Sequence, residues 1–159
     1  MQLQPSQYAA LKTAIANDPI LAAYPNTQDG AYLMAQDKLN VAFVPTFFVW
    51  QDQLTPDLYD SGLINGAVQI DALTQGKRDE LFMIGNRTRD CNMPAVRAAI
   101  SDAVGSQNTL KAAMLAIQTK PALYIEKIFA TGTGTLVSPA SLVFYGQISY
   151  QDVYSARNS

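Results

Sequence analysis

The sequence predicts a mainly α protein, a single-domain helical bundle with a long extended loop and a short C-terminal strand or hairpin. Three observations lead to this prediction. Prolines and capping residues repeatedly stand where helices begin, and apolar residues then recur at intervals of three and four. Turn residues follow these segments and end them. The length of 159 residues suits one domain of ordinary size, so we expect a single domain over 1–159.

Three short helices are expected in the first forty residues. Pro5 stands at a first helical turn. The apolar residues that follow share one face: Tyr8, Leu11 and Ile15. Asn17-Asp18-Pro19 ends this helix, and a short helical turn over 19–24 comes next. Thr27 or Asp29 then caps a third helix, whose buried face is formed by Ala31, Met34, Ala35 and Leu39.

The most apolar run in the chain is VAFVPTFFVW, from 41 to 50. Its β-branched and aromatic residues favour a strand, but Pro45 in the middle excludes a central strand. We therefore expect an extended, buried segment that lies across the helices and is anchored by Phe47, Phe48 and Trp50. The alternative is that the same side chains form an exposed docking surface.

Four helices are expected between this run and the C-terminal third. Thr55-Pro56 opens a short helix that Gly62 ends, and the segment 68–84 then forms the longest helix, up to Gly85-Asn86. After a loop over 87–91, Pro94 opens the next helix. Gly105-Ser106 divides it from a helix with one apolar stripe, formed by Leu110, Met114 and Ile117.

The C-terminal third contains the segment that we expect to mediate assembly, 131–146. Pro121 opens a helix that Gly132 ends, with one apolar face formed by Tyr124, Ile125, Ile128 and Phe129. A loop over 131–138 and a short strand over 142–146 follow. Ser149 then caps a last short helix, through Ala156, in a capping-box arrangement.

Glycine and threonine alternate at the start of that loop. Glycine gives conformational freedom and threonine favours strands, so the loop can follow a partner's surface closely. We expect it to be mobile in the free protein and ordered by a neighbouring chain. The residues expected at this contact are Thr131, Gly132, Thr133, Gly134 and Thr135. A phosphate-binding loop is excluded because no Lys-Ser or Lys-Thr follows the glycines.

The composition limits the classes of partner. Charged residues make up 15% of the chain, against about 25% in ordinary globular domains, which indicates a surface partly covered by other protein. A net charge of −2 argues against general affinity for nucleic acid. The opening residues lack the features of a signal peptide, and no apolar run reaches the length of about 18 residues typical of membrane spans. We expect a soluble protein made in the cytoplasm, without membrane contact.

The chain contains no histidine, which excludes catalysis with a histidine base and the usual nitrogen-rich metal sites. Two carboxylate pairs remain, Asp57 with Asp60 and Asp79 with Glu80. The first pair suits a helix start and the second a solvated helix face, although paired carboxylates can also hydrolyse glycosides. We interpret Cys91, the one cysteine, as a buried thiol. We therefore expect no enzymatic activity, no cofactor and no metal.

Basic residues are mildly concentrated between 77 and 97. Arg87 and Arg89 belong to this group, and they could meet acidic groups of a neighbouring subunit or phosphates of passing DNA. An ordinary hydrophilic loop between two helices is the alternative. The sequence leaves both interpretations open.

Three segments resemble a family of small virion proteins encoded among the head and tail genes of tailed bacteriophages. They are PSQYAALKTAIANDPILAAYPNTQDGAYLMAQDKLN over 5–40, the FFVW that follows, and IEKIFATGTGTLVSPASLVFYGQISYQDV over 125–153. In that family an apolar helix ending in Ala-Thr-Gly-Thr-Gly-Thr precedes a Pro-Ala turn. This chain has the same order at 130–135 and at Pro139-Ala140.

The resemblance implies a non-enzymatic structural protein of the virion, similar to the head-to-tail connectors, or adaptors, that form a ring beneath the portal. It implies other copies of the chain, the portal and tail or neck proteins as partners. A capsid cement or decoration protein and a tail-completion protein are the nearest alternatives. An alternative of another class is a lysis or glycan-cleaving enzyme that uses the carboxylate pairs.

Overall fold

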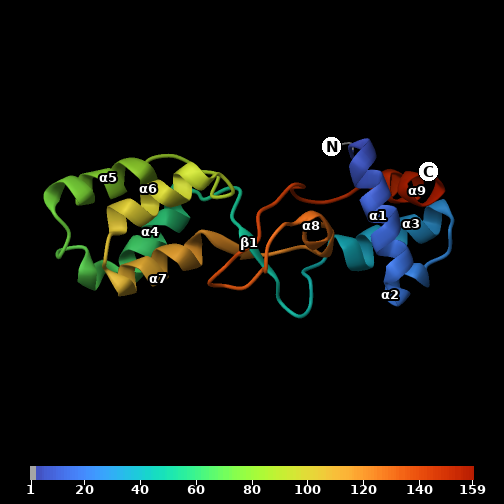
Figure 1. Cartoon of the computed structure of the whole chain (residues 1–159), viewed down its shortest axis with the longest axis horizontal. Helices are drawn as coiled ribbons and strands as arrows, with labels where there is room; N and C mark the ends of the chain where they lie inside the picture. Colours follow the sequence, from blue (N-terminus) through green and yellow to red (C-terminus); the bar gives the residue numbers. More distant parts are fainter. Residues whose placement is uncertain (1–2) are drawn as a thin grey trace. The chain divides into compact units, whose positions relative to one another are not determined.

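The computed structural model, which describes residues 3–159, is mainly α-helical, as the sequence predicts (Figure 1). Contacts within the chain divide it into two compact units. Unit 1 contains the described residues up to Phe47, together with 121–132 and 142–159, and unit 2 contains 48–120 and 133–141. Each unit is built from separate stretches of sequence. The single domain over 1–159 stays a prediction.

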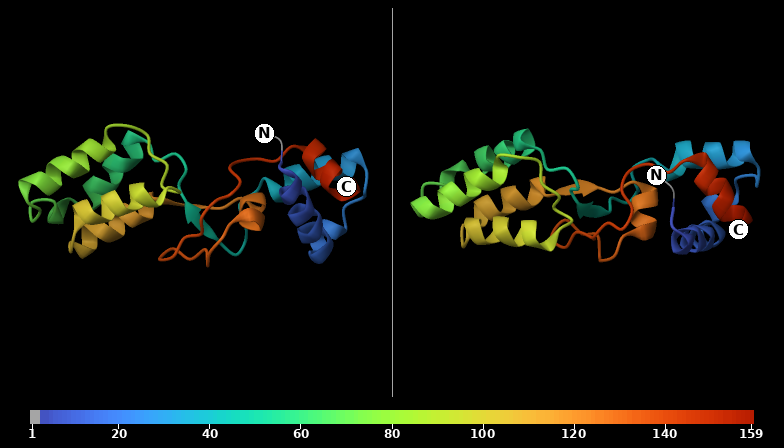
Figure 2. Two further views of the ribbon diagram at one scale, coloured as in Figure 1. Left: turned by 45° about the horizontal axis from the view of Figure 1, so that its top comes forward. Right: turned by 90° about the horizontal axis from the view of Figure 1, so that it is seen from above.

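Unit 1 is a small group of short helices in which α9 lies against both α1 and α3 (Figures 1 and 2). Its helices are α1 (Pro5–Asn17), α2 (Pro19–Ala22), α3 (Gln28–Met34), the π-helix η1 (Ala35–Leu39), α8 (Tyr124–Phe129) and α9 (Tyr150–Asn158). The core side chains on these helices include Leu11, Leu21, Met34, Leu39, Ile125 and Val153. Segments from both ends of the chain therefore share one core.

Local capping fixes the starts of three of these helices. The Asp18 side chain accepts hydrogen bonds from the first backbone N–H groups of α2. Thr27 caps α3 by accepting from Gly30 N, and Ser149 caps α9 by accepting from Asp152 N. The predicted caps Thr27 and Ser149 are confirmed, because each side-chain oxygen reaches an amide that has no partner inside the helix.

Two predictions in the C-terminal third are wrong. The helix does not begin at Pro121, which closes strand β2 (Thr119–Pro121), and it starts instead at Tyr124. Ala122 N donates to Phe47 O at 2.8 Å, and this bond keeps the backbone extended beyond the proline. The helix ends at Phe129, so Gly132 is not its terminator.

The segment 142–146 is not a strand in the described structure. Its side chains do alternate as in a strand, since Leu142 and Phe144 are buried and Val143 is exposed. At its end, Gly146 N donates to the side chain of Glu126 at 3.1 Å, and Gly146 has φ of 78°. At Gly146, the acceptor of the backbone hydrogen bond is therefore a side chain and not the backbone of a neighbouring strand.

Unit 2 contains four α-helices, with α4 packed on α7 and α5 on α6 (Figures 1 and 2). Its elements are β1 (Phe48–Trp50), α4 (Pro56–Asn65), the 3-10 helix η2 (Ala67–Gln69), α5 (Gln75–Gly85), α6 (Pro94–Val104) and α7 (Asn108–Ile117). The strand β1 pairs with β2, and Gln51 N extends the pairing with a bond of 2.7 Å to Gln118 O. The core includes Leu54, Tyr59, Leu81, Ile100, Leu110 and Met114.

The predicted helix over 68–84 is broken in two, and Thr74 caps the second part, α5. Gln69 explains the break. Its side-chain oxygen accepts from Thr109 N at 2.8 Å and Leu110 N at 3.1 Å, so it satisfies amides at the start of α7. A continuous helix from 68 would carry this residue away from α7.

The predicted end of α4 at Gly62 is also wrong, because the helix continues to Asn65. Gly62 is buried inside α4, and a Cβ atom there would lie 2.6 Å from Ile117 Cδ1 of α7. The missing side chain therefore allows a close helix–helix approach, and it does not terminate the helix.

The contact between α4 and α5 can be tested at Gly85. A Cβ atom at this position would lie 2.5 Å from Cδ1 of the buried Tyr59 ring, so Gly85→Ala should lower the free energy of unfolding by about 1–3 kcal/mol. The control is Gly76→Ala in the same helix, where nothing lies within 4 Å and alanine should stabilise by about 0.5–1 kcal/mol. Urea denaturation followed by circular dichroism measures both. Equal stability of Gly85→Ala and the unmodified protein would contradict the packing of α4 on α5.

Candidate functional site

Two of the predicted assembly segments meet through their backbones in unit 2. Phe48 N donates to Gly134 O at 2.8 Å, and Phe48 O accepts from Ala140 N at 2.9 Å. Trp50 N donates to Ala140 O at 3.1 Å. Gly134 is buried and has φ of 68°, a left-handed conformation that favours glycine. Gly134 therefore packs within its own unit, whereas we expected the loop to be ordered by a neighbouring chain.

Beyond Gly134 the loop closes into a tight turn with an apolar end. Thr135 and Ser138 exchange two backbone hydrogen bonds of 3.1 Å, and Thr133 Oγ1 adds a bond of 2.9 Å to Ser138 O. Leu136 and Val137, which we call the hairpin tip, lie between them and are 46% and 82% exposed. Such turns usually carry glycine, asparagine or aspartate. The contact residues expected from the sequence ended at Thr135, although the expected assembly segment, 131–146, contains this pair.

The aromatic anchors are half-buried, and they form neither a fully buried core nor an open surface. Trp50 packs against the unit 2 core, with the Arg97 guanidinium 4.5 Å from its ring centroid. Phe47 lies in unit 1, where its carbonyl accepts from Ala122 N. The strongly exposed side chain of this run is Val44, at 85%. The side chains of the 41–50 run thus range from the fully buried Val49 to the strongly exposed Val44, and the docking role stays a prediction.

Arg89 is used inside unit 2. Its Nε donates to Ile84 O at 2.8 Å and its Nη2 to Met83 O at 3.3 Å, at the C-terminal end of α5. Its backbone pairs with Leu54. A cation is favourable at a helix C-terminus, so Arg89 stabilises the loop that contains it. Arg87 is exposed, and it is the member of the pair that can reach a partner.

Thr131 and Gly132 belong to unit 1, and both are exposed. Gly132 has φ of 131°, which also favours glycine. The structure thus brings Gly134, Phe48 and Trp50 together in one strand-like arrangement. Thr131, Gly132 and Phe47 lie in the other unit.

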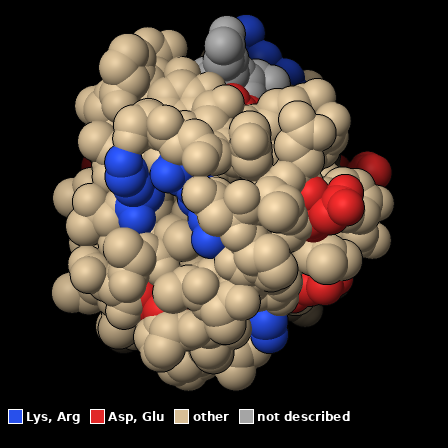
Figure 3. Space-filling view, turned by 90° about the vertical axis from the view of Figure 1, so that its right-hand side faces the viewer, with Lys and Arg blue, Asp and Glu red and all other residues tan. Residues whose placement is uncertain are grey.

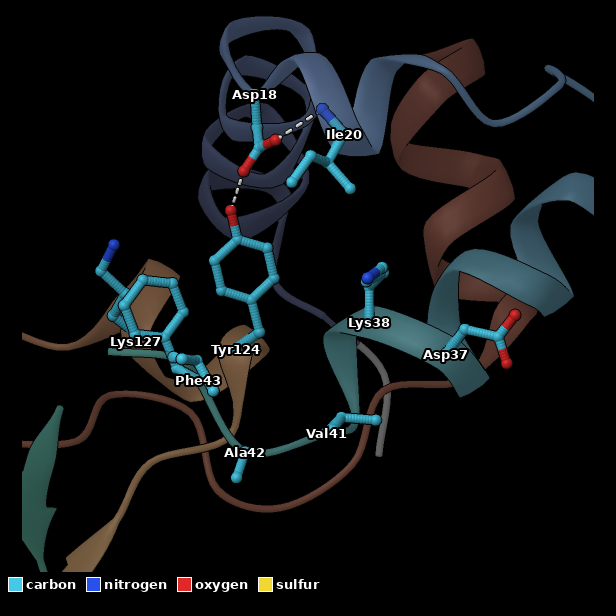
Figure 4. Close-up of a pocket in the computed structure, with 10 residues that line it drawn as sticks. Asp18, Ile20, Asp37, Lys38, Val41, Ala42, Phe43, Tyr124 and Lys127 are labelled. Carbon is cyan, nitrogen blue, oxygen red and sulfur yellow. Dashed lines mark hydrogen bonds between the residues drawn. The ribbon is translucent and has the colours of Figure 1, made fainter. Parts of the chain in front are cut away.

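Unit 1 contains a pocket of about 470 Å³, which we call the Tyr124 pocket (Figure 4). Its lining comes from α2, η1, α8 and the segment after η1: Asp18, Ile20, Asp37, Lys38, Val41, Ala42, Phe43, Val44, Tyr124 and Lys127. The rings of Phe43 and Tyr124 are stacked, with centroids 4.9 Å apart. Sequence reasoning missed this pocket because its residues come from distant parts of the chain.

Two charged groups of the Tyr124 pocket, Asp18 and Lys127, already have partners. The Tyr124 hydroxyl donates to the Asp18 carboxylate, which also accepts from Ile20 N at 2.8 Å, as Figure 4 shows. The Tyr124 bond is the main reason that the pKa of Asp18 lies below its usual value, and burial and this bond raise the pKa of Tyr124 to about 12. The Lys127 ammonium lies 3.9 Å from the Phe43 ring centroid.

The reactive groups singled out from the sequence differ in their surroundings. Burial is the main cause that raises the pKa of the Cys91 thiol to about 12, which disfavours the nucleophilic thiolate. Asp57 and Asp60 are exposed at α4, and Glu80 pairs with Lys77 at 3.3 Å. In the described part of the chain, no group of three or more His, Cys, Asp or Glu side chains is arranged to hold a metal ion. None of the described helices is long and apolar enough to span a membrane.

The chain matches none of the protein-family models, curated proteins or solved structures with which it was compared. The hairpin tip and the Tyr124 pocket are the two candidate sites in the described chain. Both have apolar, solvent-exposed side chains held by hydrogen-bonded surroundings. This arrangement suits the binding of another protein surface.

Substitution of Gly134 tests the packing of the loop. Gly134→Val should lower the free energy of unfolding by at least about 1–2 kcal/mol, because φ of 68° is strained for a residue with a side chain. The control Val137→Ser, at the exposed hairpin tip, should change it by less than about 0.5 kcal/mol. Urea denaturation followed by circular dichroism distinguishes the two. If Gly134→Val unfolds at the same urea concentration as the unmodified protein, the bond to Phe48 does not hold the loop in solution.

Tyr124→Phe tests the Asp18 contact through pH. A carboxylate whose pKa is lowered by folding stabilises the protein above its unfolded value of 3.8, and this stability is lost as pH falls through the folded pKa. Tyr124→Phe should cost about 0.5 kcal/mol at neutral pH, a small value because Asp18 is only partly buried and solvent screens its charge. It should also reduce the loss of stability below pH 3.8. Thermal unfolding across pH 2–6 measures this, and identical acid profiles would contradict the contact.

Proposed function

We propose that this chain is a non-enzymatic structural protein of a tailed-phage virion, a head-to-tail connector beneath the portal. In this proposal, copies of the chain form a ring and contact portal and tail or neck proteins. The family resemblance at 5–40 and 125–153 supports it. Arg87 provides an exposed cation for passing contact with DNA or for a neighbouring subunit.

The observation that supports assembly best is the number of large apolar side chains that are more than half exposed. They occur in both units and are Ile20, Tyr32, Val44, Ile64, Val68, Phe82, Met83, Met93, Val137 and Val143. Figure 3 shows one face of the molecule, on which uncharged residues cover most of the surface and charged side chains are few. A protein that works alone in water usually carries more charge and fewer such side chains.

An assembly role also fits what the reactive residues do. The Cys91 thiol is buried, Arg89 holds a helix end, and Lys77 contacts Glu80 and Asp102. A hydrolase of the glycoside type needs two carboxyl groups that face each other across a cleft. The described pockets are lined with at most two carboxylates, and in the Tyr124 pocket Asp18 is already bonded to tyrosine.

Location in the intact particle tests this proposal. Antibody labelling in electron micrographs of purified virions should place the chain at the head–tail junction. Mass spectrometry of the same particles should find it in multiple copies. Label over the whole head would indicate a cement protein instead, and label at the distal tail would indicate tail completion. Absence from purified virions would refute a structural role altogether.

A further inference from the structure

The ring proposed above needs a contact between neighbouring copies, and two features of the chain are complementary. We propose that the hairpin tip of one copy, Leu136 and Val137, inserts into the Tyr124 pocket of the next copy. This inference rests on the proposed function and names the partner surfaces. Both features are formed by residues of this chain, so no other protein is required for the contact itself.

The hairpin tip has the properties of an inserting element. It carries apolar side chains where solvent-exposed turns usually carry polar ones. Of the large apolar side chains in the loop, that of Val137 is the most exposed, at 82%. The two Thr135–Ser138 hydrogen bonds and the bond from Phe48 N to Gly134 O fix its backbone before binding. A preordered tip loses little conformational freedom when a partner covers it.

The Tyr124 pocket has the size and surface that such a tip needs. Its volume of about 470 Å³ lies within the range of about 300–1,000 Å³ that is typical of binding pockets. The stacked rings of Phe43 and Tyr124 form part of its lining. Ile20, Val41 and Val44 line it as well, and all three are exposed to solvent. Covering these side chains removes apolar area from water on both copies.

Charge selects an uncharged occupant for this pocket. Asp18 and Asp37 are balanced by Lys38 and Lys127 among the lining residues. Asp18 already accepts from Tyr124, and Lys127 already lies over the Phe43 ring (Figure 4). The pocket therefore offers no unbalanced charge to an ionic ligand. The segment 131–138, Thr-Gly-Thr-Gly-Thr-Leu-Val-Ser, is uncharged throughout and matches it.

A second pocket, in unit 2, is a poorer receptor for the tip. It has a volume of about 180 Å³ and lies beside Trp50. Arg97 and Lys111 line it, and its lining contains no carboxylate. An uncharged tip would take the exposed Lys111 ammonium away from water, which is unfavourable. The comparison favours the Tyr124 pocket.

The proposed contact is head-to-tail. The tip and the pocket are different surfaces, so each copy gives its tip to one neighbour and its pocket to the other. Contacts of this kind generate closed rings when the rotation between copies closes. A two-fold symmetric dimer would instead bury the same surface on both copies.

Disulfide trapping between two different variants tests the contact. Val137→Cys is mixed with an equal amount of Val44→Cys at high protein concentration and oxidised, and linked peptides are quantified by mass spectrometry. The control mixture pairs Val137→Cys with Val68→Cys, since Val68 and Val44 are 90% and 85% exposed. Cys91 stays in place because it is fully buried. Melting curves verify that all three variants fold.

We expect at least about tenfold more 44–137 linkage than 68–137 linkage, because a bound tip raises the effective concentration of the two thiols. Adding protein that carries both Val137→Asp and Val44→Asp, and so lacks a working tip and a working pocket, should not compete, whereas the unmodified protein should. Equal yields of the two linkages would overturn this inference. In that case the virion labelling described above still decides the proposed function, so the two failures are distinguishable.

Discussion

A buried carboxylate holds together the separate stretches of unit 1. Glu126 is 1% exposed, and its two oxygens accept from Leu123 N at 2.9 Å and Gly146 N at 3.1 Å. A charge removed from water is tolerated only with such partners. The first bond caps α8 and the second fixes the chain that leads to α9. Because Tyr124 is the first residue of α8, the position of its ring in the pocket also depends on Glu126.

Sequence patterns predicted correctly the helix ends that neighbouring residues determine. They failed where a contact with a residue far along the chain determines the helix end. Ser149 caps α9 with its own side chain, and its role was readable from sequence. Gly62 looks like a terminator, but its function is to admit α7 at close range. Gln69 fits an α-helix pattern, yet the α-helix is interrupted there. Its side-chain oxygen instead accepts from amides 40 and 41 residues away. Pro121 is a further case. Proline favours the start of a helix, but here strand pairing keeps it at the end of β2.

Some residues of the candidate sites could likewise be predicted from the sequence, and others could not. Gly134 was correctly picked out as a special backbone position, because its positive φ favours glycine. The Tyr124 pocket left no comparable signal. Asp18 and Tyr124 are separated by 106 positions, and no periodicity links them. Arg89 was judged by its charge, whereas its neighbours in space, the last carbonyls of α5, determine what it does.

The free energy of the proposed tip–pocket contact is consistent with a chain that forms the proposed ring only where other proteins hold its copies together. Covering Val137 and half of Leu136 contributes about 2–4 kcal/mol at the usual value per apolar side chain. Bringing two free proteins together costs about 4–15 kcal/mol, so one tip in one pocket forms only a transient dimer, which oxidation at high protein concentration can trap. A platform such as a portal that already holds the copies side by side removes most of that cost, because each contact becomes intramolecular. The weak contact is then sufficient to fix the angle between neighbours, and its weakness prevents the free chains from assembling before the platform is present.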